Sequence, residues 1–171
     1  NKICGVLALH NLRILSAQIY TWGDGTIIDD IDVISTLDKK FEDQDWEALH
    51  DDLDKALQLR LGLTHRLAKK LKPVTRRKSK PGRRPKTRVI FDSQASENFT
   101  VLEVYANNRI GLLYNITHTL SDFGINTYRA KIGSKGDQVV DVFYIQDKNG
   151  RLINDETFQK EIEEALLLAS R

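Results

Sequence analysis

Hydrophobic and polar positions in the second half of the chain follow strand and helix periods in turn. Residues 99–106 are apolar, aromatic or β-branched almost without a break, which is typical of a buried strand. Apolar positions then recur at steps of three and four, which predicts a helix. They are Leu113, Ile116, Leu120 and Phe123, and Gly124 follows as the expected end of that helix.

After Gly124 the pattern returns to strands and then to a helix. Residues 125–132 and 139–145 predict two strands joined by a Gly-containing hairpin turn. Apolar positions within residues 158–169 predict a last helix, with Asp155 as its N-cap. The order strand, helix, strand, strand, helix is one strand short of a ferredoxin-like α+β sandwich.

The first half of the chain repeats this order from its first helix onward. At an offset of 113 positions, residues 11–19 lie over 124–132, and after one extra residue in the turn 26–29 lie over 138–141. We interpret the match as a duplicated module. The counterparts of residues 99–113 would precede the first residue, so the first copy is expected to lack its N-terminal strand.

The remaining elements of the first copy follow from similar signals. Strands are expected at residues 12–20 and 27–34, around the hairpin signal Asp24-Gly25. One helix is predicted through the stripe Trp46, Leu49, Leu53, Leu57 and Leu61. Residues 87–92 predict a short spare strand that either copy could take.

Charge divides the chain into two parts. Twelve of the 26 Lys and Arg residues lie between Arg66 and Arg88 without any Asp or Glu, which leaves fourteen basic against 24 acidic residues elsewhere. All three prolines lie in the same stretch. Such a segment buries too little apolar surface to offset its ordering entropy. We therefore expect an exposed linker at residues 73–86, between a first module at 1–72 and a second at 87–171.

Composition excludes several classes of protein. The single cysteine, Cys4, excludes an internal disulfide framework and fits a reducing, cytoplasmic location. No apolar run is long enough to span a membrane, and no signal-peptide pattern opens the chain. Because the chain starts at Asn1 and has no Met, we expect it to be a fragment of a longer protein.

The sequence carries no residue set for catalysis or metal binding. Four dispersed histidines and one cysteine offer no usable ligand spacing. The run His50-Asp51-Asp52 is expected on the polar face of a helix, and Cys4 is expected to be a small buried residue. Ser16 and Ser121 have no base nearby in sequence. The chain is therefore expected not to be an enzyme itself and to hold no metal or cofactor.

Two motifs carry a resemblance to a known family. The loop pattern Arg109-x-Gly111-Leu112-Leu113 and the strand Val139-Val140-Asp141-Val142-Phe143-Tyr144-Ile145 resemble the ACT domain, the amino-acid-sensing module of metabolic enzymes. With Ile14-Leu15-Ser16-Ala17-Gln18-Ile19-Tyr20-Thr21 in the first copy, they resemble the C-terminal tandem ACT region of bacterial protein-PII uridylyltransferases. The resemblance covers nearly the whole chain. It implies a regulatory region that senses glutamine and biases upstream uridylyl-transferring and uridylyl-removing domains in nitrogen control.

The candidate ligand site is the loop between the first strand and helix of the second copy. It comprises Asn107, Asn108, Arg109, Ile110, Gly111 and Leu112. Its backbone N–H groups would open onto a helix N-terminus, which suits a carboxylate, and a glycine there would let a ligand approach the backbone. Asn126, at the start of the next strand, is expected beside the loop. The alternative is an ordinary polar turn.

The loop departs from the resembled family at two positions. That family usually has Asp-Arg-Pro-Gly, whereas Asn108 here replaces the acid and Ile110 the proline. An Asp accepts an ammonium group in a charge-assisted hydrogen bond, while Asn offers a neutral acceptor. Weakened or altered binding is therefore expected at this copy.

Other functions stay open at this point. One alternative is a ligand-free module whose copies pair by their sheet edges, within the chain or in a homodimer. Residues 66–88 could also bind nucleic acid, but no aromatic residue interrupts the basic run, so a solvated tether is favoured. The same run could instead dock on residues 24–54, which hold twelve Asp and Glu residues.

Overall fold

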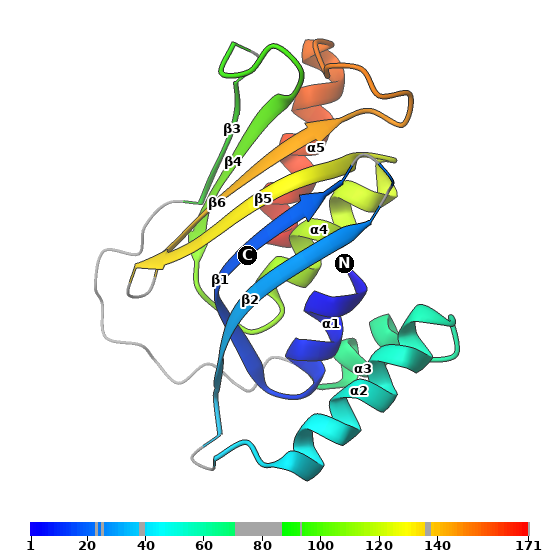
Figure 1. The fold of residues 1–171 in the computed structure, drawn as a ribbon. Helices are drawn as coiled ribbons and strands as arrows, with labels where there is room; N and C mark the ends of the chain where they lie inside the picture. Colours follow the sequence, from blue (N-terminus) through cyan, green and yellow to red (C-terminus); the bar gives the residue numbers. More distant parts are fainter. Residues whose placement is uncertain are drawn as a thin grey trace, which may run out of the picture.

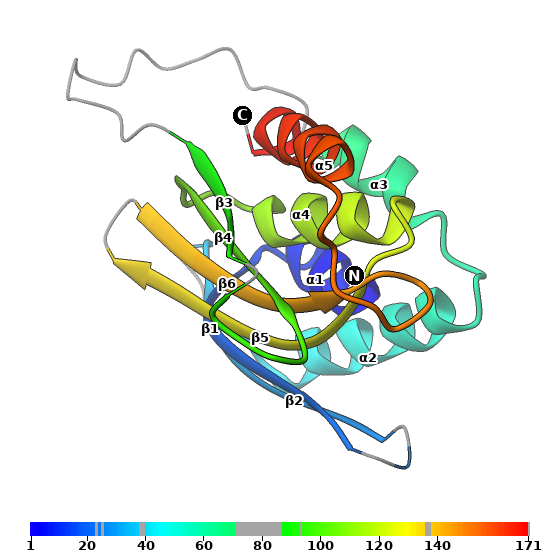
Figure 2. The same ribbon diagram turned by 90° about the horizontal axis from the view of Figure 1, so that it is seen from above.

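The computed structural model describes residues 1–22, 24, 26–37, 40–70, 87–92, 94–135 and 138–170. In this part of the chain six antiparallel strands form one sheet, and helices α1, α4 and α5 lie on the same face of it (Figure 1, Figure 2). The elements are α1 (Lys2–Leu9), β1 (Leu12–Thr21), β2 (Ile27–Ser35), α2 (Asp43–Leu57), α3 (Leu63–Lys70), β3 (Arg88–Asp92), β4 (Thr100–Asn107), α4 (Leu112–Asp122), β5 (Asn126–Lys135), β6 (Gln138–Gln146) and α5 (Glu156–Ala169). The predicted α+β class is confirmed.

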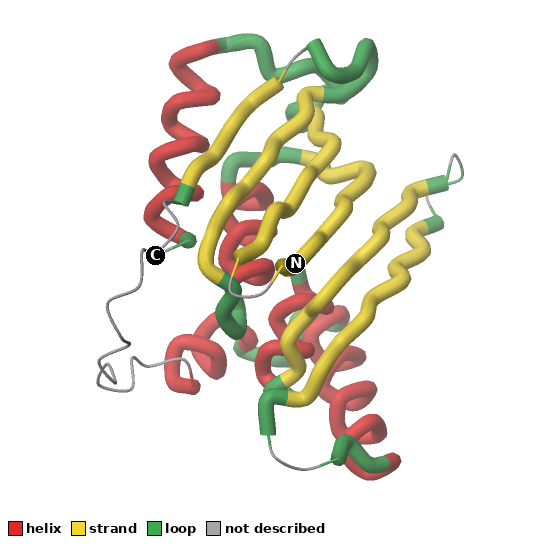
Figure 3. Tube along the Cα trace, turned by 90° about the vertical axis from the view of Figure 1, so that its left-hand side faces the viewer, coloured by secondary structure: helices red, strands yellow, loops and turns green. Residues whose placement is uncertain are grey.

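One sheet joins the two halves of the chain. Its strand order is β2-β1-β5-β6-β4-β3, so β1 of the first half pairs directly with β5 of the second (Figure 3). In that antiparallel pair Gln18 lies opposite Lys131, with Ala17 opposite Ile132 and Ile19 opposite Ala130. Gln18 and Lys131 are counterparts at the offset of 113, so the pair is centred on matching positions of the two halves.

The second half follows the predicted order closely. Gly124 follows α4 with a left-handed φ of 68°, and the Asp155 side chain accepts hydrogen bonds from the Thr157 and Phe158 N–H groups at 2.9 and 3.3 Å. Both are the helix ends that the sequence indicated. The spare strand β3 pairs with β4 and not with the first half. It thereby adds a fourth strand, at the outer edge of the sheet, to β4, β5 and β6.

The single long helix predicted through Leu61 is wrong. Helix α2 ends at Leu57, and a separate helix, α3, begins at Leu63. The break is a Schellman motif, in which the Arg60 N–H donates to the Lys55 carbonyl at 2.7 Å and the Leu59 N–H to the Ala56 carbonyl at 3.2 Å. Leu59 takes the left-handed position, with a φ of 59°, that glycine usually fills. Because a leucine takes the position where glycine usually marks a helix C-terminus, the sequence did not indicate that α2 ends here.

The core lies between the sheet and the helices α1, α4 and α5. Its most deeply buried large side chains include Phe143, Leu102, Ile116, Leu120, Ile162 and Leu166. Cys4 is buried on α1, as predicted, and burial raises the pKa of its thiol. Among the described residues no helix is long and apolar enough to cross a membrane. The expected linker at residues 73–86 lies outside the described residues.

Candidate functional site

The predicted loop connects β4 to α4. Asn107 is the last residue of β4, where it pairs with Gln138, and Leu112 opens the helix. Gly111 is the N-cap of α4 and takes the left-handed region, with a φ of 78°, which a side chain would strain. No side chain caps this helix end, so the first turn of α4 presents its amide dipoles to the loop.

Arg109 ties the loop to the end of the last helix. Its Nη2 donates to the Ala169 carbonyl oxygen at 2.8 Å, and the Asn115 Nδ2 donates to the same oxygen at 3.2 Å. A cation at a helix C-terminus is favourable. The Arg109 Nε is buried without a hydrogen-bond partner, and burial lowers the pKa of the guanidinium. Arg109 therefore connects the loop to α5, and its Nε–H remains a hydrogen-bond donor without a partner.

Asn126 does not lie beside this loop, which corrects the expectation from the sequence. It pairs with Gln146, whereas Asn107 pairs with Gln138 at the opposite end of β6. The Asn126 Nδ2 donates instead to the Asp147 carbonyl at 3.4 Å. The expectation failed because β5 leaves α4 at the far end of the sheet and runs back toward the loop, so its first residue is its most distant one.

The loop closes over a small cavity between the two halves of the chain, which we call the loop cavity. Its volume is about 30 Å³, which is room for a single water molecule. The second half lines it with residues 108–114 and with Ile132, Val139 and Asp141. The first half lines it with residues of α1 and the start of β1: Cys4, Ala8, Leu12, Arg13 and Ile14.

Asp141 is the most deeply buried charged group in this cavity. It lies on β6 with 1% of its surface exposed, on the same strand face as Val139 and Phe143. Burial raises the pKa of its carboxyl to about 7, and a hydrogen bond from the Gly133 backbone opposes that shift only in part. Its Oδ1 has no hydrogen-bond partner.

Unpartnered polar atoms gather at the loop cavity. The described residues contain five buried side-chain nitrogen or oxygen atoms without a hydrogen-bond partner, and three of them belong to residues that line this cavity. They are the Nε atoms of Arg13 and Arg109 and the Oδ1 of Asp141. Buried polar groups are normally paired, so a concentration of unpaired ones marks a candidate binding site. Two donors and one acceptor suit a ligand with both an anionic and a cationic end.

Arg13 and Asp141 line the loop cavity although they were not predicted from the sequence as site residues, and both carry a signal in the sequence. Arg13 is the counterpart of Asn126 at the offset of 113, and the antiparallel pairing of β1 with β5 brings it to the loop in place of Asn126. Asp141 is an acid at a core-facing position of β6, whose other buried residues, Val139, Phe143 and Ile145, are apolar. The strand period alone would have marked that position as unusual.

A second and larger pocket, which we call the open pocket, is lined in part by the counterparts of residues that line the loop cavity. Its volume is about 600 Å³. Asn126 lies here, and so does Asp29, the counterpart of Asp141, whose Oδ1 is also buried without a partner. Burial raises the pKa of the Asp29 carboxyl. Five residues that line the open pocket, between α4 and the start of β5, are counterparts of the first-half lining of the loop cavity: Thr117, Ser121, Ile125, Asn126 and Thr127.

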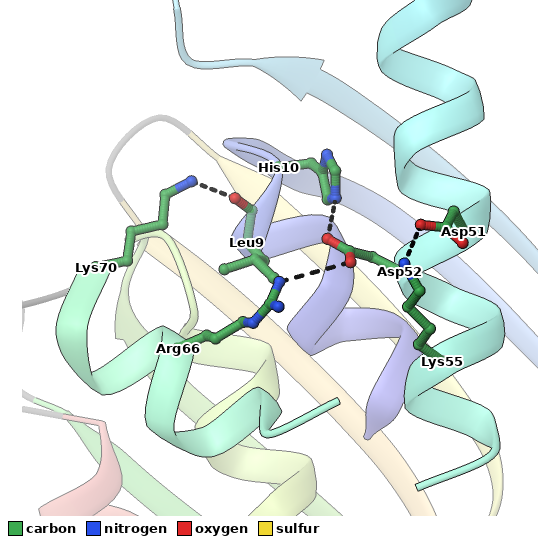
Figure 4. Close-up of polar contacts among 7 residues, drawn as sticks. All are labelled: Leu9, His10, Asp51, Asp52, Lys55, Arg66 and Lys70. Atoms are coloured by element: carbon green, nitrogen blue, oxygen red, sulfur yellow. Dashed lines mark hydrogen bonds and ion pairs between the residues drawn. The ribbon is translucent and has the colours of Figure 1, made fainter. Parts of the chain in front are cut away.

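The run His50-Asp51-Asp52 takes part in helix packing. The Asp52 carboxylate receives the His10 Nε2 at 3.0 Å and the Arg66 Nη1 at 3.6 Å, which joins α2 to the end of α1 and to α3 (Figure 4). Lys70 donates to the Leu9 carbonyl in the same region (Figure 4). No group of three or more His, Cys, Asp or Glu side chains in the described part of the chain could hold a metal ion.

Comparison with protein families defines the class of this domain. Residues 95–171 match the family model described as the ACR family N-terminal ACT domain. This half of the chain, which contains the loop and Asp141, is therefore an ACT regulatory domain. No solved structure gave a significant match to the chain.

Comparison with curated proteins extends the match to the first half. The chain is 34% identical over 167 residues to the bifunctional uridylyltransferase/uridylyl-removing enzyme of Bradyrhizobium sp. strain ORS 278, covering 96% of the chain and 18% of that protein. The enzymes of that name from Rhodospirillum rubrum and Azospirillum brasilense are 33% and 30% identical over 172 and 177 residues, or 97% and 99% of the chain. The chain spans about 18% of the length of each of these relatives. It is thus an ACT region of the bifunctional uridylyltransferase/uridylyl-removing enzyme family.

Proposed function

We propose that this chain is the amino-acid-sensing region of a protein-PII uridylyltransferase, that its ligand is glutamine, and that the ligand binds at the β4–α4 loop. The observation that carries the proposal is the loop cavity, where the amides of the α4 N-terminus meet the unpartnered groups of Arg109 and Asp141. An α-amino acid brings a carboxylate for the first two and an ammonium for the third. The names of the relatives supply the activities that such a region would regulate.

We further propose that the chain is a tandem of two ACT modules. The order helix, strand, strand recurs as α1-β1-β2 and α4-β5-β6. The β1–β5 pair that joins them is centred on counterparts, Gln18 and Lys131, as expected for two copies related by a local two-fold axis. In this arrangement each cavity between the copies takes lining residues from both. A ligand there would stabilise one arrangement of the two modules.

The regulatory mechanism follows from the Arg109 contact. A ligand carboxylate near the loop would compete for the guanidinium that now binds the end of α5. Binding would thereby shift the balance between two arrangements of the loop and α5, and with it the balance between transfer and removal of uridylyl groups in the upstream domains. The loop cavity has room for only about one water molecule, so the loop must move for an amino acid to enter.

Calorimetric titration of the chain with glutamine, and with a panel of other amino acids, tests the proposal. Saturable heat with glutamine, and a higher melting temperature in its presence, are expected. A Gly111→Ala variant should weaken binding, because a side chain at φ 78° strains the loop that receives the carboxylate. Absence of heat and of thermal shift with every amino acid at millimolar concentration would contradict the sensing function.

A second function, an interaction module that binds no small molecule, is favoured by one observation. The sheet face opposite α1, α4 and α5 exposes apolar side chains on three strands: Ile28, Ile34, Ile90 and Val140. A homodimer through this face, stable and indifferent to amino acids, would support that function, and sedimentation equilibrium measures it.

Nucleic-acid binding through residues 66–88 gains less support. Arg66 and Lys70 contact Asp52 and the Leu9 carbonyl of the same chain, and the Arg88 guanidinium lies 4.5 Å from the Tyr105 ring centroid. The contact of Arg66 with Asp52 is also an instance of the predicted docking of the basic run on the acidic stretch 24–54.

A further inference from the structure

Asp141 is a buried acid that the fold holds at a cost. Its side chain is 1% exposed, its Oδ1 has no hydrogen-bond partner, and its neighbours on the strand face, Val139 and Phe143, are apolar. Burying a carboxyl group with an open acceptor is unfavourable, and an apolar residue would fill this place at a lower cost. The Asp141 Oδ1 therefore lacks a hydrogen-bond donor that a bound ligand could supply.

The surroundings of Asp141 define what that partner can be. The other titratable side chains that line the loop cavity are Cys4 of α1, Arg13 of β1, Arg109 of the loop and Tyr114 of α4. The two guanidiniums each keep an unpartnered Nε, so they are available to an anionic group. A molecule that pairs with all three atoms carries both an anionic and a cationic group, as an α-amino acid does.

The loop itself lacks an acid for the cationic group, because Asn108 offers only a neutral acceptor there. We propose that Asp141, from the neighbouring strand β6, binds the ammonium group of the amino acid at this loop. This inference rests on the sensing function proposed above and deepens it by naming the residue that distinguishes an amino acid from a plain carboxylic acid.

The proposal carries a pH dependence. Because the pKa of the Asp141 carboxyl is about 7, the group is mostly protonated at pH 6 and mostly ionised at pH 8. An ammonium ligand binds the ionised form, so binding at pH 6 must release the carboxyl proton to the buffer. Affinity for glutamine should fall about tenfold between pH 8 and pH 6, with close to one proton released per ligand at pH 6.

The test compares two ligands on two variants. Glutamine and its analogue without the ammonium group, glutaramic acid, are titrated into the wild-type chain, Asp141→Asn, and the control Asp30→Asn, which changes an exposed acid on β2. The wild type and the control should prefer glutamine by 10- to 100-fold, the range of a buried charge-assisted hydrogen bond. Asp141→Asn should bind both ligands about equally, with an affinity that no longer changes between pH 6 and pH 8.

Three outcomes would overturn the proposal. If Asp141→Asn keeps the preference and the pH profile of the wild type, Asp141 does not bind the ammonium group, while amino-acid sensing stands. If the wild type takes up glutamine at pH 6 without releasing a proton, as measured in buffers of different ionisation enthalpy, the assignment fails without need of a variant. If the wild type binds no amino acid at millimolar concentration, the sensing function and this assignment fail together.

Discussion

The loop cavity and the open pocket both lie between the two halves and are lined at matching positions, yet they differ in volume and in chemistry. The first holds about 30 Å³ and brings together Arg13, Arg109 and Asp141, whereas the second holds about 600 Å³ and brings Asn126 to the position matching Arg13. Both keep an acid, Asp141 or Asp29, on the second strand of the hairpin. The acid position is therefore common to the two cavities, while the position on the first hairpin strand differs: it is Arg13 in the loop cavity and Asn126 in the open pocket.

The largest expected effect concerns the two acids. Between pH 4 and pH 7 the folded chain holds a proton on Asp141 that the unfolded chain has lost, so stability falls as pH rises through this window. A pKa raised from 3.8 to about 7 corresponds to a loss on the order of 4 kcal/mol above pH 7. Asp141→Asn should therefore be more stable than the wild type by up to that amount at pH 8.

Urea denaturation at pH 4, 6 and 8 measures this difference. The gain of Asp141→Asn over the wild type should be close to zero at pH 4 and reach its full value at pH 8. Asp29→Asn is the matched variant of the other pocket, where the acid is only partly buried, so its gain should have the same sign and be smaller. Equal gains for the two variants would contradict the distinction between the cavities.

The helices and strands of this fold were easier to predict from the sequence than the way in which they pair and pack. Period and turn residues were enough for β4, α4, β5, β6 and α5, since each is a local pattern bounded by residues such as Gly124 and Asp155. The loop was found in the same way. Asn126 was misplaced and Arg13 overlooked because the cavity forms where β1 pairs with β5, and no local pattern specifies a pairing between strands more than a hundred residues apart. The break after Leu57 was missed because a leucine takes the left-handed position.

A smaller effect is expected at the helix ends that lead into β1 and β5. Gly124 follows α4 with a φ of 68°, and its counterpart Asn11 follows α1 with a φ of 59°. Gly124→Ala should cost about 1–2 kcal/mol, because a Cβ there makes only an ordinary contact with the Lys148 Cβ at 3.8 Å and the strain lies in the left-handed backbone. Asn11→Gly should gain less than about 0.5 kcal/mol, since Asn tolerates this region and Gly adds entropy to the unfolded chain. Thermal unfolding of both variants checks the order, and a larger effect at Asn11 would contradict it.

The smallest expected effect concerns the polar contacts that hold α5 in the second half and α2 in the first. In the second half, Arg109 and Asn115 bind the end of α5, whereas in the first half Asp52 joins α2 to His10 and Arg66 (Figure 4). Asp52 is 18% exposed and Asn keeps an acceptor oxygen, so Asp52→Asn should cost about 1 kcal/mol, the net contribution of a typical hydrogen bond.

Asp51 provides the control one position away, because its pair with Lys55 on the same helix lies in solvent with 62% of the Asp51 side chain exposed. Asp51→Asn should cost no more than about 0.5 kcal/mol, and 1 M salt should remove that cost. The cost of Asp52→Asn should persist in salt, because a partly buried contact is screened less. Equal, salt-sensitive losses at both positions would mean that α2 is held by apolar packing alone, and that the two halves do not differ in this respect.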